Sequence, residues 1–237
     1  EVYFGNENAM VRFDMSEYQD QASVARLIGG NGQAGLLTEA IRRAPFSLLL
    51  LDELEKAHPD ILNLFLQVMD DGRLTDGLGR TIDFTNVILI ATSNAGTQFI
   101  QDEVKKGTDL VAIKTALMEN ELRQIYRPEF LNRFDDVIVF TPLTADDVAA
   151  IAYLMVNKIE ERIKAKGLSF RIDDEAIHEL AALGYDPKFG ARPLRRVLQE
   201  RVENVIAERI LQGDVGRRDT VVYRKGGEVT VEKAAAL

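Results

Sequence analysis

The feature that most constrains the fold is an uninterrupted apolar run, Leu48 to Leu51, that ends in the adjacent carboxylates Asp52 and Glu53. A short apolar run bounded by polar residues is typical of a strand in a parallel sheet covered on both faces. Residues at the carboxyl end of such a strand lie where open α/β sheets bind ligands. The run therefore predicts a buried strand that delivers Asp52 and Glu53 to a binding site.

A second apolar run, Val87–Ala91, is followed directly by the polar residues Thr92, Ser93 and Asn94. Because the carboxyl ends of parallel strands meet at one edge of a sheet, both runs are expected to supply the same site. Adjacent acids there suit a nucleotide triphosphatase, in which one carboxylate holds Mg2+ and the next orients a water. Taken alone, Asp52 and Glu53 also fit a helix N-terminus that carries acids.

The residues up to 141 combine strand and helix patterns, which predicts an α/β fold with a parallel sheet. The predicted elements besides the two apolar runs are a strand over 11–15, helices over 36–43 and 59–69, an exposed loop with a hairpin over 70–86, and a further strand over 137–140.

A domain boundary is predicted at Thr141 and Pro142, because Thr144 can cap a helix whose first turn carries Asp146 and Asp147. Beyond it the pattern is mostly helical with a small sheet. The predicted elements are helices over 144–163, 174–183 and 190–212, a strand near Phe170, and a hairpin over 220–231. The predicted domains are 1–141 and 142–233, and residues 234–237 are predicted to be a vector-derived tail.

Composition narrows the function classes. The net charge of −9 argues against a general nucleic-acid binder, and the absence of cysteine excludes disulfides and thiolate metal sites. No apolar run approaches the roughly 18 residues of a membrane span. A reducing, cytoplasmic location is expected, and because the chain begins at Glu1 it is predicted to be a fragment.

Five separated runs resemble the second ATPase module of the Clp family of AAA+ unfoldases, and they occur in the order of that family. These runs are 51–59, 71–76, Thr92-Ser93-Asn94, 127–133 and 190–194. The resemblance implies a partial P-loop NTPase fold with helices on both faces of the sheet and a mostly helical small domain. It also implies ATP and Mg2+ as cofactors, a hexameric ring, and unfolded or aggregated polypeptide as substrate.

The resemblance assigns roles to residues at the sheet edge. Asp52 resembles the carboxylate that binds Mg2+, usually through water, and Glu53 resembles the group that polarises the attacking water. Asn94 resembles the sensor 1 residue, whose amide holds that water or a γ-phosphate oxygen. The alternative for Asn94 is an Asx turn before Gly96, which is compatible with a sensor role.

Three arginines also match the family. Arg133 resembles the arginine finger, which stabilises charge on the γ-phosphate of a neighbouring subunit; the alternative is a surface salt bridge with Asp135 or Asp136. Arg127 is a candidate second interface arginine. Arg192 resembles sensor 2, with ordinary surface charge at a helix start as the alternative.

The sequence departs from the family in its phosphate loop, because no Gly-x-x-x-x-Gly-Lys-Ser/Thr run occurs. In the family this loop and the first strand precede the position of Glu1. Without the backbone N–H groups and lysine of that loop, we expect weak or no ATP binding and no hydrolysis by these residues alone.

Two further departures concern loops. The stretch 29–35 lacks the aromatic residue with which the family grips substrate, whereas residues 72–86 resemble an intact second pore loop. Residues 95–130 lack the Ile-Gly-Phe or Ile-Gly-Leu tripeptide of protease partners, which favours the ClpB type of disaggregase. The alternative functions are an AAA+ module that acts on nucleic acid and a non-catalytic module for ring assembly.

Overall fold

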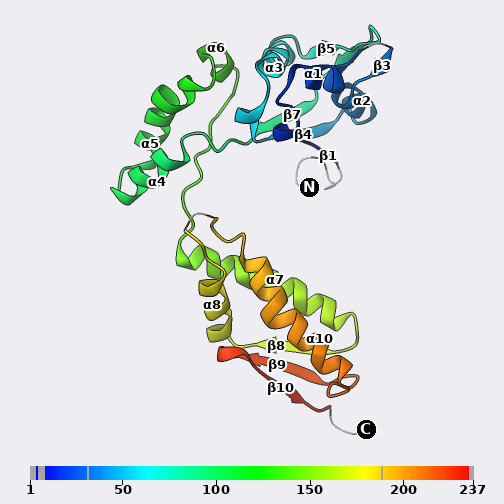
Figure 1. Ribbon diagram of the computed structural model, residues 1–237, viewed down its shortest axis with the longest axis vertical. Helices are drawn as coiled ribbons and strands as arrows, with labels where there is room; N and C mark the ends of the chain where they lie inside the picture. Colours follow the sequence, from blue (N-terminus) through cyan, green and yellow to red (C-terminus); the bar gives the residue numbers. More distant parts are fainter. Residues whose placement is uncertain (1–3, 5–8, 31, 188, 235–237) are drawn as a thin grey trace. The chain divides into compact units, whose positions relative to one another are not determined.

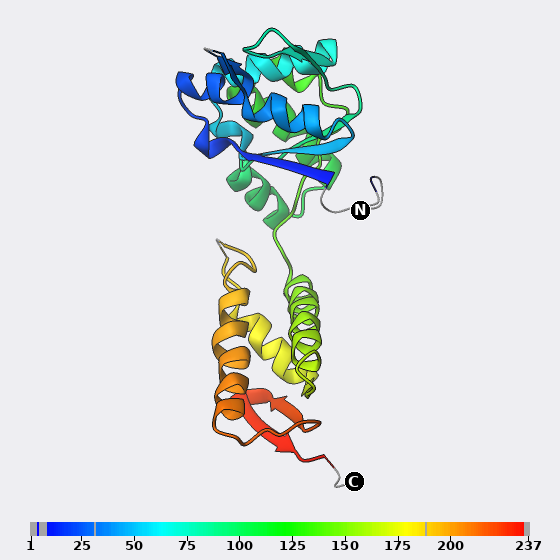
Figure 2. The same cartoon turned by 90° about the vertical axis from the view of Figure 1, so that its right-hand side faces the viewer.

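The chain forms two compact units, Glu1–Thr141 and Pro142–Leu237 (Figures 1 and 2). The computed structural model describes residues 4, 9–30, 32–187 and 189–234. Each unit has its own hydrophobic core.

The first unit is built on a parallel sheet of β1 (Met10–Asp14), β4 (Ser47–Asp52) and β7 (Val87–Ala91), in the order β1-β4-β7. In the register of this sheet, Leu50 lies between Arg12 of β1 and Ile90 of β7. The predicted apolar strands and the α/β fold class are therefore confirmed, and β4 is the central strand.

One face of the sheet carries the core of the unit. Leu49 and Leu51 are buried there with apolar residues of α1 (Gln21–Ile28), α2 (Leu36–Arg43) and α3 (Pro59–Asp71). The opposite face is less covered, since Met10, Ile88 and Ile90 are exposed. Figure 1 shows the three helices grouped beside the strands.

Helix α3 has clear boundaries in the sequence. The Asp60 N–H donates to His58 Nδ1 at 3.2 Å, and Pro59 occupies the first turn, where a missing N–H costs nothing. The helix ends at Asp71 and is capped by Gly72, whose φ of 63° is readily adopted by glycine.

Two short hairpins lie side by side in the first unit. They are β2 (Gly29–Gly30) with β3 (Gln33–Ala34), and β5 (Arg73–Thr75) with β6 (Thr81–Asp83). A Cβ at Gly77 would lie 2.3 Å from the carbonyl carbon of Gly29, and the Gly77 N–H donates to the Ile28 carbonyl at 2.8 Å. The stretch that lacks the expected aromatic residue is thus packed against the second loop.

The unit continues through α4 (Thr97–Lys105), α5 (Leu110–Ala116) and α6 (Pro128–Leu131), but the strand predicted over 137–140 does not form. Val137 and Val139 pack against the core, whereas Ile138 and Phe140 are 74% and 86% exposed. The segment thus has the alternation of a strand. Its prediction was wrong because no neighbouring strand pairs with it among the described residues.

The second unit begins with α7 (Ala145–Lys164). Thr144 caps this helix, because its Oγ1 accepts from the Asp147 N–H at 3.2 Å while the Thr144 N–H donates to Asp147 Oδ2 at 2.8 Å. This reciprocal capping box confirms the predicted helix start.

The rest of the second unit packs helices on one small sheet. These elements are β8 (Ser169–Ile172), α8 (Asp174–Leu183), α9 (Leu194–Leu198), α10 (Asn204–Leu211), β9 (Thr220–Arg224) and β10 (Glu228–Glu232), with the sheet order β10-β9-β8. The long helix predicted from residue 190 begins only at Leu194, after a turn that includes Pro193, and a π-helical segment, Gln199–Glu203, joins α9 to α10. Apolar residues of α7, α8, α9 and α10 form the core with β8 and β9.

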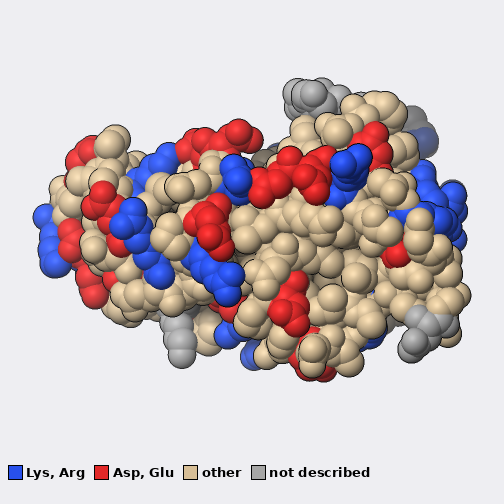
Figure 3. Space-filling model, turned by 90° about the horizontal axis from the view of Figure 1, so that it is seen from above, with Lys and Arg blue, Asp and Glu red and all other residues tan. Residues whose placement is uncertain are grey.

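The surface carries both signs of charge. On the face shown in Figure 3, Lys and Arg side chains are interspersed with Asp and Glu side chains. Among the helices described, none combines the length and apolar character that a membrane span requires.

Asp219 joins the loop before β9 to the end of the described chain. Its carboxylate accepts from the Gly216 N–H at 2.7 Å, the Ala234 N–H at 2.9 Å and Lys233 Nζ at 3.0 Å. The Ala234 bond is the largest cause that lowers the Asp219 pKa to about 2.

We predict that Asp219→Asn lowers the melting temperature of the second unit at pH 6. A depressed folded-state pKa contributes stability that is present above the usual pKa of 3.8 and is lost as pH falls through about 2. The difference in melting temperature between the parent and Asp219→Asn should therefore become smaller between pH 4 and pH 2, as measured by calorimetric scans. Glu208→Gln, on the exposed side of α10, is the control and should have the melting temperature of the parent at every pH. If the melting temperature of Asp219→Asn differed from that of the parent by the same amount at every pH, ionisation of Asp219 would not be the source of the stability.

Candidate functional site at the carboxyl ends of β4 and β7

The sheet brings the polar ends of β4 and β7 together. The Thr92 N–H donates to the Leu51 carbonyl and the Leu54 N–H donates to the Thr92 carbonyl, both at 2.9 Å. These bonds continue the ladder beyond the last paired residues, Leu51 and Ala91. Asp52, Glu53 and Asn94, which the sequence predicts as site residues, therefore lie at one edge of the first unit.

Asp52 is held as a carboxylate by two donors. Thr92 Oγ1 donates to Asp52 Oδ1 and Arg12 Nη2 donates to Asp52 Oδ2. The Thr92 hydroxyl is the largest cause that lowers the Asp52 pKa, and the Arg12 guanidinium is the second. Asp52 is thus ionised near neutral pH, which is the state in which a hard cation is bound.

Glu53 has an unusual backbone. Its φ of 55° and ψ of 49° lie in the left-handed region, which L side chains other than Asn and Asp rarely adopt. Its N–H donates to Thr92 Oγ1 at 3.2 Å, so the hydroxyl that holds Asp52 also holds this turn. Strained residues of this kind are enriched at functional sites, because the surrounding contacts must maintain them.

The turn after β7 is fixed by side chains. Ser93 Oγ accepts from the Ala95 N–H at 3.1 Å and from the Tyr126 hydroxyl at 3.2 Å. Burial is the main cause that raises the pKa of Tyr126 to about 12, so this hydroxyl remains a donor. The local turn is therefore made by Ser93, and the Asx turn considered for Asn94 does not form among its described contacts.

Asn94 itself is bound to Glu55. Both the Asn94 N–H and Asn94 Nδ2 donate to Glu55 Oε1, at 3.2 Å and 3.4 Å. The Asn94 side chain is otherwise exposed at the carboxyl end of the sheet.

Arg133 forms an intrachain ion pair, but its partner differs from the predicted alternative. Arg133 Nε lies 2.5 Å from Asp70 Oδ1, in the last turn of α3, whereas Asp136 pairs with Lys114. Arg127 Nη1 lies 3.6 Å from Glu129 Oε1, and both side chains are exposed. Both arginines remain at the surface of the first unit, where a guanidinium can exchange partners.

Arg192 belongs to the second unit. It lies in the turn before α9 and is exposed; within the described part of the chain, its side chain makes no ion pair. The structure describes it only with its own unit, so its relation to Asp52, Glu53 and Asn94 stays a prediction.

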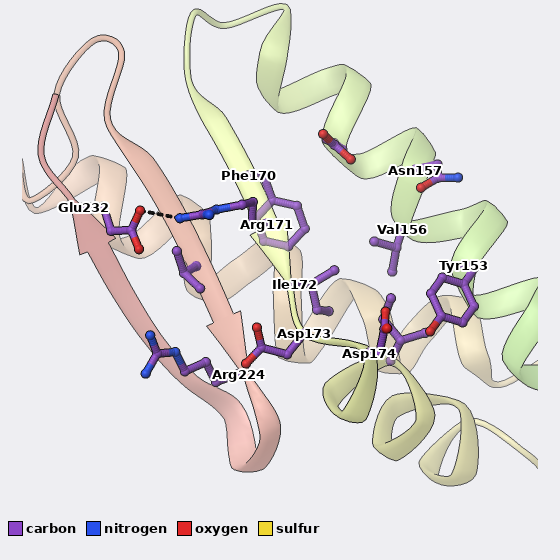
Figure 4. Close-up of a pocket in the computed structure, with 13 residues that line it drawn as sticks. Tyr153, Val156, Asn157, Phe170, Arg171, Ile172, Asp173, Asp174, Arg224 and Glu232 are labelled. Atoms are coloured by element: carbon purple, nitrogen blue, oxygen red, sulfur yellow. Dashed lines mark hydrogen bonds and ion pairs between the residues drawn. The ribbon is translucent and has the colours of Figure 1, made fainter.

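The second unit also contains a pocket of about 420 Å³ (Figure 4). Tyr153, Val156 and Asn157 of α7 face Phe170 and Ile172 of β8 across it. None of its described lining residues is a predicted site residue.

Sequence reasoning missed four residues that hold the site: Arg12, Glu55, Thr92 and Tyr126. Thr92 and Glu55 lie inside the runs that resemble the family, but the sequence assigned no function to either residue. Arg12 becomes visible only through the register, which places it beside Leu50 of β4. Tyr126 approaches from a distant segment, and no local pattern indicates that.

The donors fit a nucleotide and Mg2+ only in part. The lowered pKa makes Asp52 an ionised carboxylate, which is the class of hard-oxygen donor that Mg2+ prefers. Within the described residues, no larger group of His, Cys, Asp and Glu gathers at a metal-binding spacing. Among the described residues, the edge thus presents two carboxylates and an amide, and the 237-residue sequence contains no phosphate-loop motif beside them.

We predict that Thr92→Val raises the Asp52 pKa toward its usual 3.8, because Thr92 is the largest cause of the depression. Carbon-detected NMR titration of the Asp52 carboxyl measures the shift. The matched control is Thr97→Val, since the Thr97 hydroxyl donates to the Asn94 carbonyl and leaves Asp52 untouched. An unchanged Asp52 titration in Thr92→Val would refute the contact.

Comparison with known proteins assigns both units. The family described as AAA domain (Cdc48 subfamily) matches residues 1–137. The family described as the C-terminal, D2-small domain of ClpB protein matches residues 143–223. The two matches meet where the two compact units meet.

Whole-chain relatives agree with these matches. A probable chaperone protein ClpB 1 of Chlorobaculum tepidum is 49% identical over 232 residues, which cover 93% of this chain and 53% of that protein. A chaperone protein ClpB of Rhodopirellula baltica is 47% identical over 96% of this chain and 26% of its own length. An ATP-dependent Clp protease ATP-binding subunit ClpC of Staphylococcus epidermidis is 45% identical over 98% of this chain and 29% of its own length.

The chain thus spans between about a quarter and about half the length of these relatives. Identity alone does not separate the ClpB and ClpC types, because the values are close. The second unit matches the family described as the small domain of ClpB, and the ClpC relative also covers that unit. The chain belongs to the AAA ATPase family, in its Clp branch, and its second unit is a small domain of the ClpB type.

Proposed function

We propose that the chain is the carboxyl-terminal ATPase module of a chaperone that remodels unfolded or aggregated polypeptide in the cytoplasm. The observation that carries this proposal is the convergence of Asp52, Glu53 and Asn94 at one sheet edge, where the Thr92 hydroxyl contacts Asp52 and the Glu53 N–H. The family membership supports the same function, because relatives that match nearly the whole chain are named as chaperones.

Each residue of the edge has a role in this proposal. Asp52 would hold Mg2+, and Glu53 would accept a proton from the water that attacks the γ-phosphate. Asn94 binds that water or a γ-phosphate oxygen. Bound Mg2+ supplies charge neutralisation on the phosphates.

Arg133 and Arg192 belong to the ring form of the site. Arg133 would leave Asp70 and reach the nucleotide of a neighbouring subunit in a hexamer. Arg192 would bring the second unit to the same nucleotide, which would couple ATP to domain movement. Exposure of both guanidinium groups supports these roles.

A nucleic-acid function is not favoured. The net charge is −9, and basic side chains are interspersed with acidic ones on the face in Figure 3. A basic stripe that follows phosphates is the usual signature of such a module.

We predict that the 237-residue chain binds ATP with Mg2+ more weakly than about 1 mM, because these residues contain no phosphate loop. Isothermal titration calorimetry at pH 7 measures the affinity. A dissociation constant in the micromolar range would show that the sheet edge alone binds phosphates, and would contradict the prediction.

The activity itself is tested by joining the chain to an upstream region that carries a phosphate loop. Residues 1–233 replace the matching segment of the Rhodopirellula baltica ClpB, which is 47% identical. The joined protein should form rings, hydrolyse ATP and reactivate heat-aggregated luciferase. If the first ATPase module of the joined protein is inactivated by mutation, the rate of phosphate release measures hydrolysis by the second module alone.

In this joined protein, Glu53→Gln should lower kcat by about 10²–10⁴-fold while ATP still binds, because only the proton acceptor is lost. Glu119→Gln is the matched control, since Glu119 is exposed and distant in sequence from the edge. Full activity of Glu53→Gln would remove Glu53 from the mechanism. Rings that bind ATP but show no hydrolysis in the parent would favour a non-catalytic assembly module.

A further inference from the structure

We propose that Glu55 is a positioning residue that orients the side-chain amide of Asn94. Its carboxylate turns Asn94 Nδ2 inward and leaves Asn94 Oδ1 as an outward-facing hydrogen-bond acceptor. The inference rests on the proposed function of Asn94, and it adds a residue to which no role has been assigned.

The chemistry of the contact sets the orientation of the amide. A carboxyl oxygen that takes two N–H groups acts only as an acceptor, whereas an amide has a donor end and an acceptor end. Glu55 Oε1 takes both the Asn94 N–H, at 3.2 Å, and Asn94 Nδ2, at 3.4 Å. The amide oxygen must therefore point away from Glu55.

The backbone of Asn94 is fixed independently. Its carbonyl accepts from Thr97 Oγ1 at 2.6 Å and from the Thr97 N–H at 3.3 Å. Ser93 makes the local turn, so the Asn94 side chain is not needed for it. The side-chain torsions are the remaining freedom, and the Glu55 contact restricts them.

The environment of Glu55 is not that of an ordinary surface carboxylate. Glu55 Oε2 is buried and has no hydrogen-bond partner among the described residues. Buried polar atoms without partners are rare in folded proteins and call for an explanation. A glutamine would lower this penalty, but its amide can rotate and present either end to Asn94. A carboxylate accepts at both oxygens, so it enforces a single orientation.

The orientation has a chemical consequence. Asn94 Oδ1 accepts no hydrogen bond from the described residues and lies at the exposed carboxyl end of the sheet. An acceptor there can take one O–H of a water whose other O–H is taken by the Glu53 carboxylate. The lone pairs of that water then remain free for attack on phosphorus. Asn94 would thus bind the water through its oxygen.

The contact is tested first in the 237-residue chain, by 15N NMR of the Asn94 side-chain amide. In the parent, the two Nδ2 protons should have well-separated shifts and one should exchange slowly with solvent. Glu55→Ala should collapse this separation toward that of a free amide, and Glu55→Gln should give two sets of signals or an average. Glu119→Gln should leave them unchanged. Asn94 signals that do not respond to either Glu55 substitution would overturn the proposal.

The functional consequence is tested in the joined ATPase. Glu55→Ala should lower kcat about 10- to 100-fold, as loss of an orienting residue typically does, while KM for ATP changes less than twofold. Glu55→Gln should lie between Glu55→Ala and the parent. If Glu55→Ala fails to fold, kcat and the amide signals are compared between the parent and the isosteric Glu55→Gln instead. A parent-like kcat together with an unchanged Asn94 amide signal in Glu55→Gln overturns the proposal.

A double substitution separates the inference from the function beneath it. If Glu55 acts through Asn94, Glu55→Ala should cost little further kcat in an Asn94→Ala background. Additive losses would indicate a general structural role and overturn the inference. If Asn94→Ala alone leaves kcat unchanged, the proposed function of Asn94 fails, whatever Glu55 does to its amide. If Asn94→Ala lowers kcat and Glu55→Ala does not, only the inference fails.

Discussion

The parallel pairing of β4 with β7 is the interaction on which the rest of the first unit depends. It sets Leu51 beside Ala91, and the ladder then runs one step further through Thr92. That extra step places one threonine hydroxyl between Asp52 and the Glu53 backbone. A shift of the register by one residue would turn Leu49 and Leu51 out of the core and move every polar group of the edge. Core packing and site geometry are therefore fixed by the same set of backbone bonds.

Much of the fold could be predicted because its signals are local. The apolar run ending at Asp52 and the Thr144 cap each act within a few residues of the element that they define. The two failures had different causes. Residues 137–140 have the alternation of a strand, yet a strand exists only where a partner offers donors and acceptors. The helix expected from residue 190 starts later because a turn with Pro193 precedes it, and an apolar stripe cannot show where the first helical hydrogen bond forms.

The candidate site divides in the same way. Asp52, Glu53 and Asn94 follow strand ends, so their place at one edge of the sheet was predictable from the pattern, whereas the roles assigned to them came from the family resemblance and stay predictions. Arg12 and Glu55 contact the site through register and through a short turn, and a sequence without its pairing does not reveal either contact. Arg133 shows the converse, because its charge was recognised but its partner is Asp70, which lies far away in sequence. Residue type can thus be read from the chain, whereas ion-pair partners depend on the fold.

The left-handed backbone of Glu53 has a consequence for how such a domain responds to selection. Glycine adopts this conformation without the steric cost that a Cβ incurs, and the Glu53 side chain contributes no described hydrogen bond to the fold. A library screened for thermal tolerance alone would therefore enrich glycine at this position and discard the carboxylate. At position 53, thermal stability favours glycine whereas the proposed catalysis requires glutamate. Variants selected for thermal stability should therefore be checked at this position first.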